Sequence, residues 1–437
     1  MILERMRRAS AGAALRATMC AFSAALLLAA FLVPDARGML AGLVRIVSAP
    51  AQLTRDYFMP ELGGVSGALL NAVLVGAVCC ALTFLPEAKV SGATVLGFFL
   101  TTGYGAYGIN LLNMLPFVLG VFVYSRLRRQ PFGRFINLAM FSTGLAPLAS
   151  EALFRYPGAQ VHGAAFPGAL LALGIGIVVG CAMPALCAHS PAFHKGFDLY
   201  NAGPAAGFLC FLIYAVLYRT LGVEPPAAAA ELGEGHRLFV NVFCAAWFGS
   251  CLAFGLLLNG GIGDFRGLLM DSGYRTDFTE KYAPGSCLMN LGAYGLFILL
   301  YYNLIGARFT GVTMGAVFCM AACACAGATP LNVLPIMIGY ILASRFGASA
   351  VNAQAIVVGL CYASGLAPVS GVYGPVAGIV AGMLHYCLVT SVPATHGGLN
   401  LYNGGFTAGI VCFVLVPLLE HWLPRGRGRD NSEGRVG

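Results

Sequence analysis

Charged side chains are scarce in this sequence, since Asp, Glu, Lys and Arg together make up 10% of its 437 residues, against roughly 25% in a soluble domain. Hydrophobic residues make up 59%. This balance excludes a soluble globular protein, because too little polar surface remains to face water, and it excludes intrinsic disorder. The apolar residues form long continuous runs, not the alternating pattern of a β-barrel. The runs predict an all-α polytopic membrane protein.

Several enzyme motifs are also missing. The sequence contains no HExxH, GxSxG or Walker A pattern, and the missing ATP site argues against a primary pump that acts alone. The 15 cysteines lie mostly inside apolar runs, where Cys behaves as a small hydrophobic residue. No CxxC pair stands in a polar loop where it could bind zinc. We therefore expect no catalytic residue, no metal and no cofactor.

Lysine is rare, with three residues in the chain, so Arg carries most of the formal net charge of +8. Arg clusters occur at 5–8, 126–134 and 425–435. Nucleic-acid binding is one interpretation, but in so apolar a chain we favour cytoplasmic loops that follow the positive-inside rule. Both termini are then predicted to be cytoplasmic in a bacterial inner membrane. The acidic segment 223–236 suits the outside.

Apolar runs of about 20 residues, the length that spans a bilayer, occur seven times in each half of the chain. The first of them follows a basic start and is interpreted as a retained anchor helix. The predicted spans lie near 15–33, 65–85, 90–107, 110–127, 134–153, 166–187, 199–221, 237–258, 286–305, 310–327, 330–346, 350–367, 373–392 and 400–423. The pair 90–107 and 110–127 and its counterpart in the second half are predicted to be re-entrant or broken helices.

The two halves are related by an internal repeat. Residues 194–211 align without a gap on 396–413, including the pairs His194/His396 and Asn201/Asn403. Three further blocks match in the same order, and they are 35–38 with 264–267, 112–126 with 331–345, and 144–147 with 365–368. We predict a first repeat at 1–222, an external linker at 223–236, a second repeat at 237–423 and a basic, disordered cytoplasmic tail at 424–437.

The charge distribution requires an odd number of crossings in each half, so that the second half inserts upside down. Seven crossings each satisfy this condition, and so do five crossings with a re-entrant pair. The expected fold is therefore an inverted-topology repeat of roughly 10–14 transmembrane helices, an architecture of many transporters and channels.

The doubled motif Leu-Tyr-Asn-x-Gly-x-x-Ala-Gly, at 199–207 and 401–409, resembles that of a duplicated bacterial integral-membrane family catalogued as domain of unknown function 1576. This resemblance covers roughly residues 60–423 and implies no activity, substrate or catalytic residue. A weaker similarity to urea transporters rests on the Tyr-Asn pairs. The chain departs from their Asn-Pro pore-helix pattern, because Asn113 and Asn332 stand three residues before a proline.

The repeated polar residues are the candidate substrate-binding or pore-lining groups. They are Tyr200, Asn201, Gly203, Tyr402, Asn403, Gly405, Asn113, Pro116, Asn332 and Pro335. Each motif also has a structural interpretation: Asn can cap a helix, Gly at positions i and i+4 can let helices pack closely, and Asn before Pro can stabilise a kink. If the amides line a site, inverted symmetry predicts that the four Asn converge around one polar cavity.

Ionisable residues inside the apolar runs give a second set of hypotheses. His194 and His396 are candidate gating residues, or plain interfacial histidines. Asp198 aligns with Asn400 and Glu151 aligns with no acid in the second half. Neither carboxylate is therefore shared by the two repeats. An intramembrane carboxylate is by default a functional candidate.

These observations favour a transporter or channel for a small, neutral polar solute, bound where the repeats meet. The alternative is a membrane-embedded enzyme or lipid-handling protein that uses His194, His396, Asp198 or Glu151, and a third possibility is a structural subunit. The expected partners are the lipid bilayer and the solute, with no nucleic acid. The sequence leaves open whether the chain forms a homo-oligomer.

Overall fold

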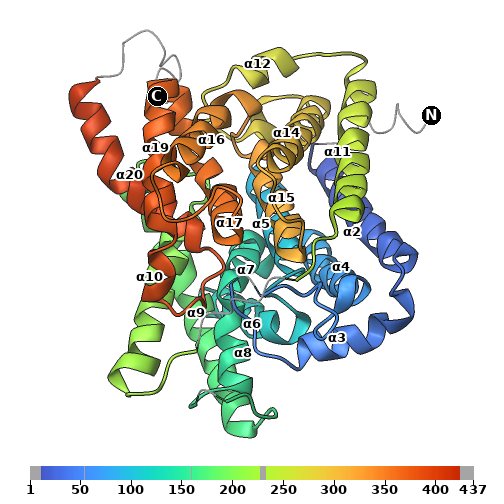
Figure 1. The fold of residues 1–437 in the computed structure, drawn as a ribbon, viewed down its shortest axis with the longest axis vertical. Helices are drawn as coiled ribbons and strands as arrows, with labels where there is room; N and C mark the ends of the chain where they lie inside the picture. The colour runs from blue at the N-terminus through green and yellow to red at the C-terminus, as the bar shows by residue number, and fades with distance from the viewer. Residues whose placement is uncertain (1–10, 54, 159, 227–232, 424–437) are drawn as a thin grey trace.

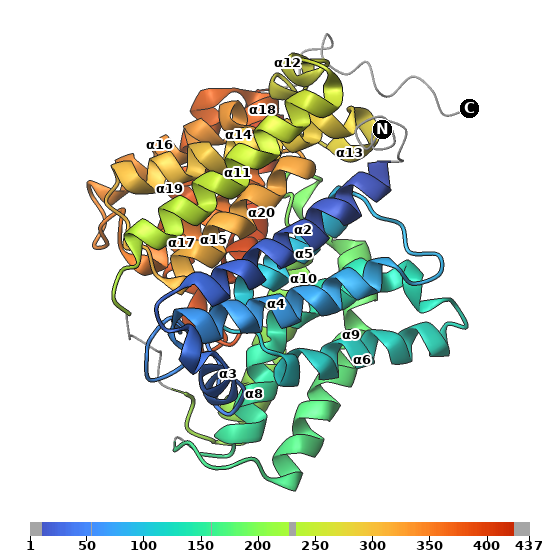
Figure 2. The same ribbon diagram turned by 90° about the vertical axis from the view of Figure 1, so that its right-hand side faces the viewer.

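The computed structural model describes residues 11–53, 55–158, 160–226 and 233–423. The predicted basic tail 424–437 and the Arg cluster at 5–8 lie outside the described residues. Within the described part the regular elements are helical and no strand occurs. Figures 1 and 2 show the first half, coloured blue to green, below the second half, coloured yellow to red.

The helices of the first half follow one another with short connections. They are α2 (Ala11–Leu32), α3 (Met39–Val47), α4 (Gly64–Thr83), α5 (Gly92–Tyr104), α6 (Leu111–Leu127), α7 (Ile136–Ser142), the 3₁₀ turn η3 (Thr143–Leu145), α8 (Ala146–Phe154), α9 (Phe166–His194) and α10 (Ala202–Tyr214), which continues as the π-helical turn η4 (Ala215–Thr220).

The second half repeats this order. Its helices are α11 (Arg237–Asn259), α12 (Phe265–Leu269), α13 (Phe278–Lys281), α14 (Pro284–Leu304), α15 (Gly311–Ala322) with η5 (Cys323–Cys325), α16 (Pro330–Ser344), α17 (Gln354–Ala363), η6 (Ser364–Leu366), α18 (Ala367–Tyr373), α19 (Pro375–Val389) and α20 (Asn403–Trp422).

Each of the fourteen predicted spans overlaps a helix of the structure. Eight helices in the described part of the chain are long and apolar enough to cross a membrane, and shorter apolar helices lie between them. The chain is therefore a multi-pass membrane protein. The predicted pair 90–107 and 110–127 corresponds to α5 and α6, and its counterpart corresponds to α15 and α16. Of these, α5 has 13 residues and α15 has 12, so each extends about 20 Å, less than the roughly 30 Å of a bilayer core.

Equivalent hydrogen bonds in the two halves confirm the repeat. The Asn71 amide on α4 donates to the carbonyls of Gly105 and Ile109, both at 2.7 Å. The Asn290 amide on α14 donates to the carbonyls of Ala324 and Ala328, at 2.9 and 2.8 Å. In both halves one long helix thus satisfies the backbone carbonyls left free where the short helix ends.

The halves contact each other through two pairs of equivalent helices. Helix α5 packs against α15, where Gly103 and Gly315 face each other's backbone. Helix α10 packs against α20. Because α10 and α20 carry the Leu-Tyr-Asn motifs, both copies of the motif lie where the two halves meet.

Candidate functional site

The two copies of the repeated motif meet at the starts of α10 and α20. A Cβ atom on Gly203 would collide with the backbone of Gly405, and one on Gly207 would overlap the ring of Phe406. The small residues of the motif therefore permit close helix contact, as the packing interpretation expects. The same contact places Tyr200 and Tyr402 near the interface between the halves.

A histidine five residues before each motif holds the asparagine of that motif. His194 Nε2 donates to Asn201 Oδ1 at 2.9 Å, and His396 Nε2 donates to Asn403 Oδ1 at 3.0 Å. The two amides then donate to backbone carbonyls of the preceding long helix, Asn201 to Cys187 at 3.2 Å and Asn403 to Val389 at 3.0 Å. The Asn side chains thus fasten the loop to α9 or α19, and they do not act as side-chain N-caps.

Each motif is also hydrogen-bonded to the other half. The Leu199 N–H donates to the Gly365 carbonyl at 3.0 Å, and the Leu401 N–H donates to the Gly144 carbonyl at 2.9 Å. Gly144 and Gly365 lie in the 3₁₀ turns η3 and η6. The residue three positions later is a proline, which has no N–H to donate to their carbonyls. The Gly-Leu-Ala-Pro segment of each half therefore supplies the carbonyl that accepts a hydrogen bond from the Leu-Tyr-Asn motif of the other half.

Buried tyrosines fill the centre between the two motifs. The ring centroids of Tyr200 and Tyr362 are 5.0 Å apart, and those of Tyr104 and Tyr402 are 5.7 Å apart. The Tyr200 hydroxyl donates to the carbonyls of Cys319 and Cys361, whereas the Tyr402 hydroxyl is buried without a partner among the described residues. A buried polar group without a partner is costly, and water or a ligand commonly satisfies it.

A cavity of about 450 Å³ reaches this tyrosine cluster. Its lining combines residues of the first motif, helix α5 and the loop that follows α12, and Tyr402 of the second motif. The lining residues that carry polar side chains are Asp198, Tyr200, Asn201, Arg275, Thr276, Asp277, Glu280 and Tyr402. Arg275 and Glu280 are exposed, whereas Asp198 is 3% exposed, so the cavity leads from the surface to buried groups.

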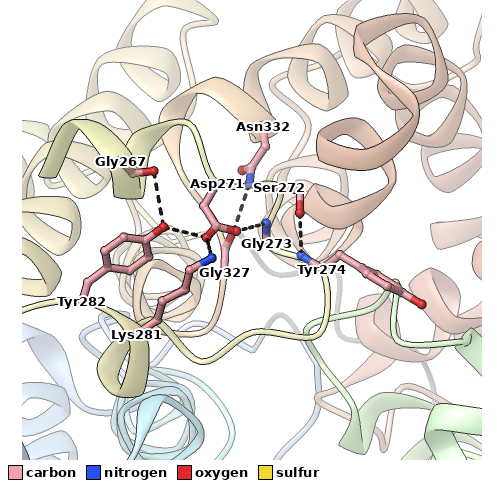
Figure 3. Close-up of polar contacts among 9 residues, drawn as sticks. All are labelled: Gly267, Asp271, Ser272, Gly273, Tyr274, Lys281, Tyr282, Gly327 and Asn332. Carbon is pink, nitrogen blue, oxygen red and sulfur yellow. Dashed lines mark hydrogen bonds and ion pairs between the residues drawn. The ribbon is translucent and has the colours of Figure 1, made fainter. Parts of the chain in front are cut away.

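The wall formed by the loop after α12 is held by Asp271, as Figure 3 shows. Its carboxylate accepts hydrogen bonds from Lys281 Nζ at 2.6 Å, the Tyr282 hydroxyl at 2.7 Å and the Gly273 N–H at 2.9 Å. Burial alone would raise the pKa of Asp271, but the bonds from Lys281, Gly273 and Tyr282 outweigh it, so the pKa lies below its usual value. The loop is therefore anchored by an ionised carboxylate at neutral pH.

The residues of the two Asn-Pro segments are not among those that line this cavity. Asn113 and Asn332 complete capping boxes at the starts of α6 and α16, and their amides donate to the carbonyls of Gly108 and Gly327, both at 2.9 Å. A separate, largely apolar cavity of about 270 Å³ is lined by Asn113 and Pro116. For this pair the sequence had offered a stabilised kink before proline as the structural alternative, and the structure shows a capping role instead.

The four candidate asparagines therefore do not converge on one cavity. Asn201 lines the 450 Å³ cavity, Asn113 the 270 Å³ cavity and Asn403 a small one of about 90 Å³. The physical reason is that all four amides find backbone carbonyls nearby, so they need no common polar space. Pro335, next to Asn332 on α16, lies against Gly378 of α19.

Sequence reasoning missed the charged wall of the large cavity. Arg275, Asp277 and Glu280 belong to a stretch from 264 to 281 that is dense in charge for this chain, which is the signal that could have found them. Glu151 lies on α8, where it forms an ion pair with Arg155 at 3.3 Å, and it does not line the cavity. Among the described residues, no group of three or more His, Cys, Asp and Glu could hold a metal ion.

Comparison with known proteins gives one match. A family model described as "Protein of unknown function (DUF1576)" matches the chain over residues 36–219 and 262–421. The two matched segments correspond to the two halves of the structure. No curated protein and no solved structure matches the chain, so the similarity to urea transporters is not shown.

Proposed function

We propose that this chain, which belongs to the family of proteins of unknown function DUF1576, is a membrane transporter or channel for a small, neutral polar solute. The observation that carries the proposal is the 450 Å³ cavity, because Tyr200 and Tyr402, from the two copies of the motif, both line it. Solute sites of transporters built from repeats commonly lie where the repeats meet.

The neutral character of the solute is supported by the residues that both repeats share. At the two motifs these are tyrosine, asparagine and glycine, which can exchange hydrogen bonds with a polar solute without a charge. The Tyr402 hydroxyl has an unused hydrogen-bonding capacity at the cavity. Tyr200, Asn201 and Tyr402 line the cavity, and we include Gly203, Asn403 and Gly405 of the adjoining motifs in the proposed site. His194 and His396, which hold the amides, are the proposed gating residues.

An inverted arrangement of the repeats 1–222 and 237–423 is part of the proposal. In its support, each half contributes an equivalent contact to the other: Asp56 accepts from the Gly311 N–H, and Asp277 accepts from the Gly92 N–H. With seven crossings in each half, 223–236 would lie outside and both termini in the cytoplasm of an inner membrane. Single-cysteine variants test this. Glu87→Cys should be labelled only from the inside and Asn352→Cys only from the outside.

Uptake into liposomes tests the function. The purified chain should admit at least one of urea, acetamide and glycerol faster than empty liposomes do. Tyr402→Phe should lower the uptake rate of that solute, because it removes an unpaired hydroxyl from a residue that lines the cavity. Tyr294→Phe is the matched control, since its hydroxyl is also buried without a partner among the described residues but does not line the cavity. Equal uptake by both variants would contradict the site.

The Asn residues need a measurement of stability beside uptake. Asn201→Leu with Asn403→Leu should abolish uptake per folded molecule if the amides also meet solute. If they only fasten the loops to α9 and α19, the double variant should have a lower melting temperature while its folded fraction still transports. That second result would remove Asn201 and Asn403 from the site.

A further inference from the structure

Asp198 lines the large cavity and has a buried carboxylate oxygen without a partner among the described residues. Its Oδ1 accepts a hydrogen bond from the Tyr200 N–H at 2.9 Å. Its Oδ2 is buried and has no partner among the described residues, and the residue lines the 450 Å³ cavity. An ionised carboxylate that is 3% exposed and unpaired is costly, so its retention calls for an explanation.

The second repeat shows that the fold does not need this charge. Asn400 occupies the position of Asp198, and its Oδ1 accepts from the Tyr402 N–H at the same distance of 2.9 Å. The turn at the motif therefore requires one side-chain oxygen, which an amide supplies equally well. The ionisable group of Asp198 is therefore an addition in the repeat whose motif lines the large cavity.

The rest of the lining does not neutralise Asp198. Three carboxylates (Asp198, Asp277 and Glu280) and one cation (Arg275) line the cavity. The Arg275 guanidinium lies over the Tyr274 ring, 5.2 Å from its centroid. In the described part of the chain the ion pairs are Arg134–Glu87, Arg155–Glu151, Lys195–Glu420 and Lys281–Asp271, so none joins Arg275 to these acids.

We propose that Asp198 binds a monovalent cation in this cavity, either an alkali-metal ion that moves with the solute or an ammonium group. The role of the cation in moving solute rests on the proposed function, but cation binding itself can be measured without transport. A cation would satisfy Oδ2, and Asp277 and Glu280 would add to the negative potential that attracts it. Asn400 explains why the site occurs once, although the motif occurs twice.

Thermal unfolding of the purified chain in detergent tests the binding. Sodium chloride, potassium chloride and methylammonium chloride are compared at equal ionic strength with the chloride of N-methyl-D-glucamine, which is too large for a close fit. A ligand that binds only the folded state raises its melting temperature. We expect a saturable rise with at least one small cation, and about a tenfold or greater increase in its half-saturating concentration for Asp198→Asn. Glu61→Gln, which alters an exposed acid that does not line the cavity, should leave that concentration unchanged.

The arms of the experiment separate the sources of the cation. A rise with sodium or potassium but not methylammonium identifies an alkali-metal ion. A rise with methylammonium alone identifies an ammonium group and would replace the neutral solute of the proposed function with a cationic one. No cation-specific rise in the wild-type chain, or an equal rise in Asp198→Asn, would overturn the inference.

If the Asp198→Asn variant does not fold, the melting temperatures of the wild-type chain with each cation still test the inference. Failure of the proposed function would give a different result. If the chain bound a cation but admitted no solute, the transport proposal would be wrong and the Asp198 site would still stand.

Discussion

Asp56 and Asp277 perform reciprocal roles across the interface between the halves. Asp56 Oδ1 accepts from the Gly311 N–H at 3.0 Å, at the start of α15 in the second half. Asp277 Oδ2 accepts from the Gly92 N–H at 2.9 Å, at the start of α5 in the first half. Each half therefore supplies a carboxylate to an unsatisfied N–H of the other half's short helix, where a negative charge also complements the helix dipole. The caps link the two halves directly.

Loss of the Asp277 cap should destabilise the folded protein. Asp277→Ala leaves the Gly92 N–H without its carboxylate and removes the bond to the Thr279 N–H. Because loss of a helix cap costs about 0.5–2 kcal/mol, we expect the free energy of unfolding in detergent to fall by that amount. Glu280→Ala is the control, since this exposed neighbour should stay within about 0.5 kcal/mol of the wild type. Equal losses in both variants would show that the cap contributes little.

Asp56 should make the stability depend on pH. Burial removes its carboxylate from water and raises the pKa to about 6 from 3.8, although the N–H groups of Phe58 and Gly311 and the charge of Arg308 act in the opposite direction. A raised carboxyl pKa means that folding favours the protonated form. Its contribution to stability is therefore full below pH 3.8 and is lost as the pH rises through about 6.

Asp56→Asn checks this dependence, because the amide keeps an oxygen acceptor and cannot ionise. The pKa difference corresponds to roughly 3 kcal/mol at about 1.4 kcal/mol per unit. Unfolding followed between pH 4 and pH 8 should show the variant gaining stability relative to the wild type as the pH rises, by up to that amount. Parallel pH profiles for the two proteins would rule out Asp56 as the titrating group.

The positions of the helices could be predicted from the sequence because a membrane-spanning helix is specified locally by its apolar residues. The repeat could also be predicted, since equivalent residues such as Asn71 and Asn290 make equivalent bonds. The site could be predicted only in part. The Asp277–Gly92 bond joins residues 185 positions apart, and no local pattern indicates which loop closes a cavity. The amides of Asn113 and Asn332 bond to carbonyls only five residues away. That both repeats carry the same residue does not reveal whether its partner is local or a solute.

The amides of Asn71 and Asn290 should be required for folding because they donate and not because of their size. Asn71→Leu would leave the carbonyls of Gly105 and Ile109 buried without a donor, at about 1–3 kcal/mol for each group. Asn71→Asp has the same shape but offers oxygens to those two carbonyls, so it should be at least as destabilising.

The same pair of changes at Asn290 should give similar losses, because its bonds are equivalent. Denaturant unfolding in detergent measures the losses, and Asn352→Leu, at an exposed loop residue, is the control. A stable Asn71→Asp variant would refute the donor argument.

The contact between the two motifs should tolerate a methyl group on one side only. A Cβ on Gly203 would collide with the backbone of Gly405, whereas a Cβ on Gly405 would lie 3.3 Å from its nearest neighbours, Gly203 Cα and Tyr200 Cβ. Gly203→Ala should therefore lower the melting temperature more than Gly405→Ala. Overpacking costs about 1–3 kcal/mol, which exceeds the helix propensity of up to about 1 kcal/mol that alanine gains. Gly249→Ala on α11, where nothing lies within 4 Å of the new Cβ, should be neutral or stabilising. If Gly203→Ala behaved like Gly249→Ala, α10 and α20 would not pack as closely as the structure has them.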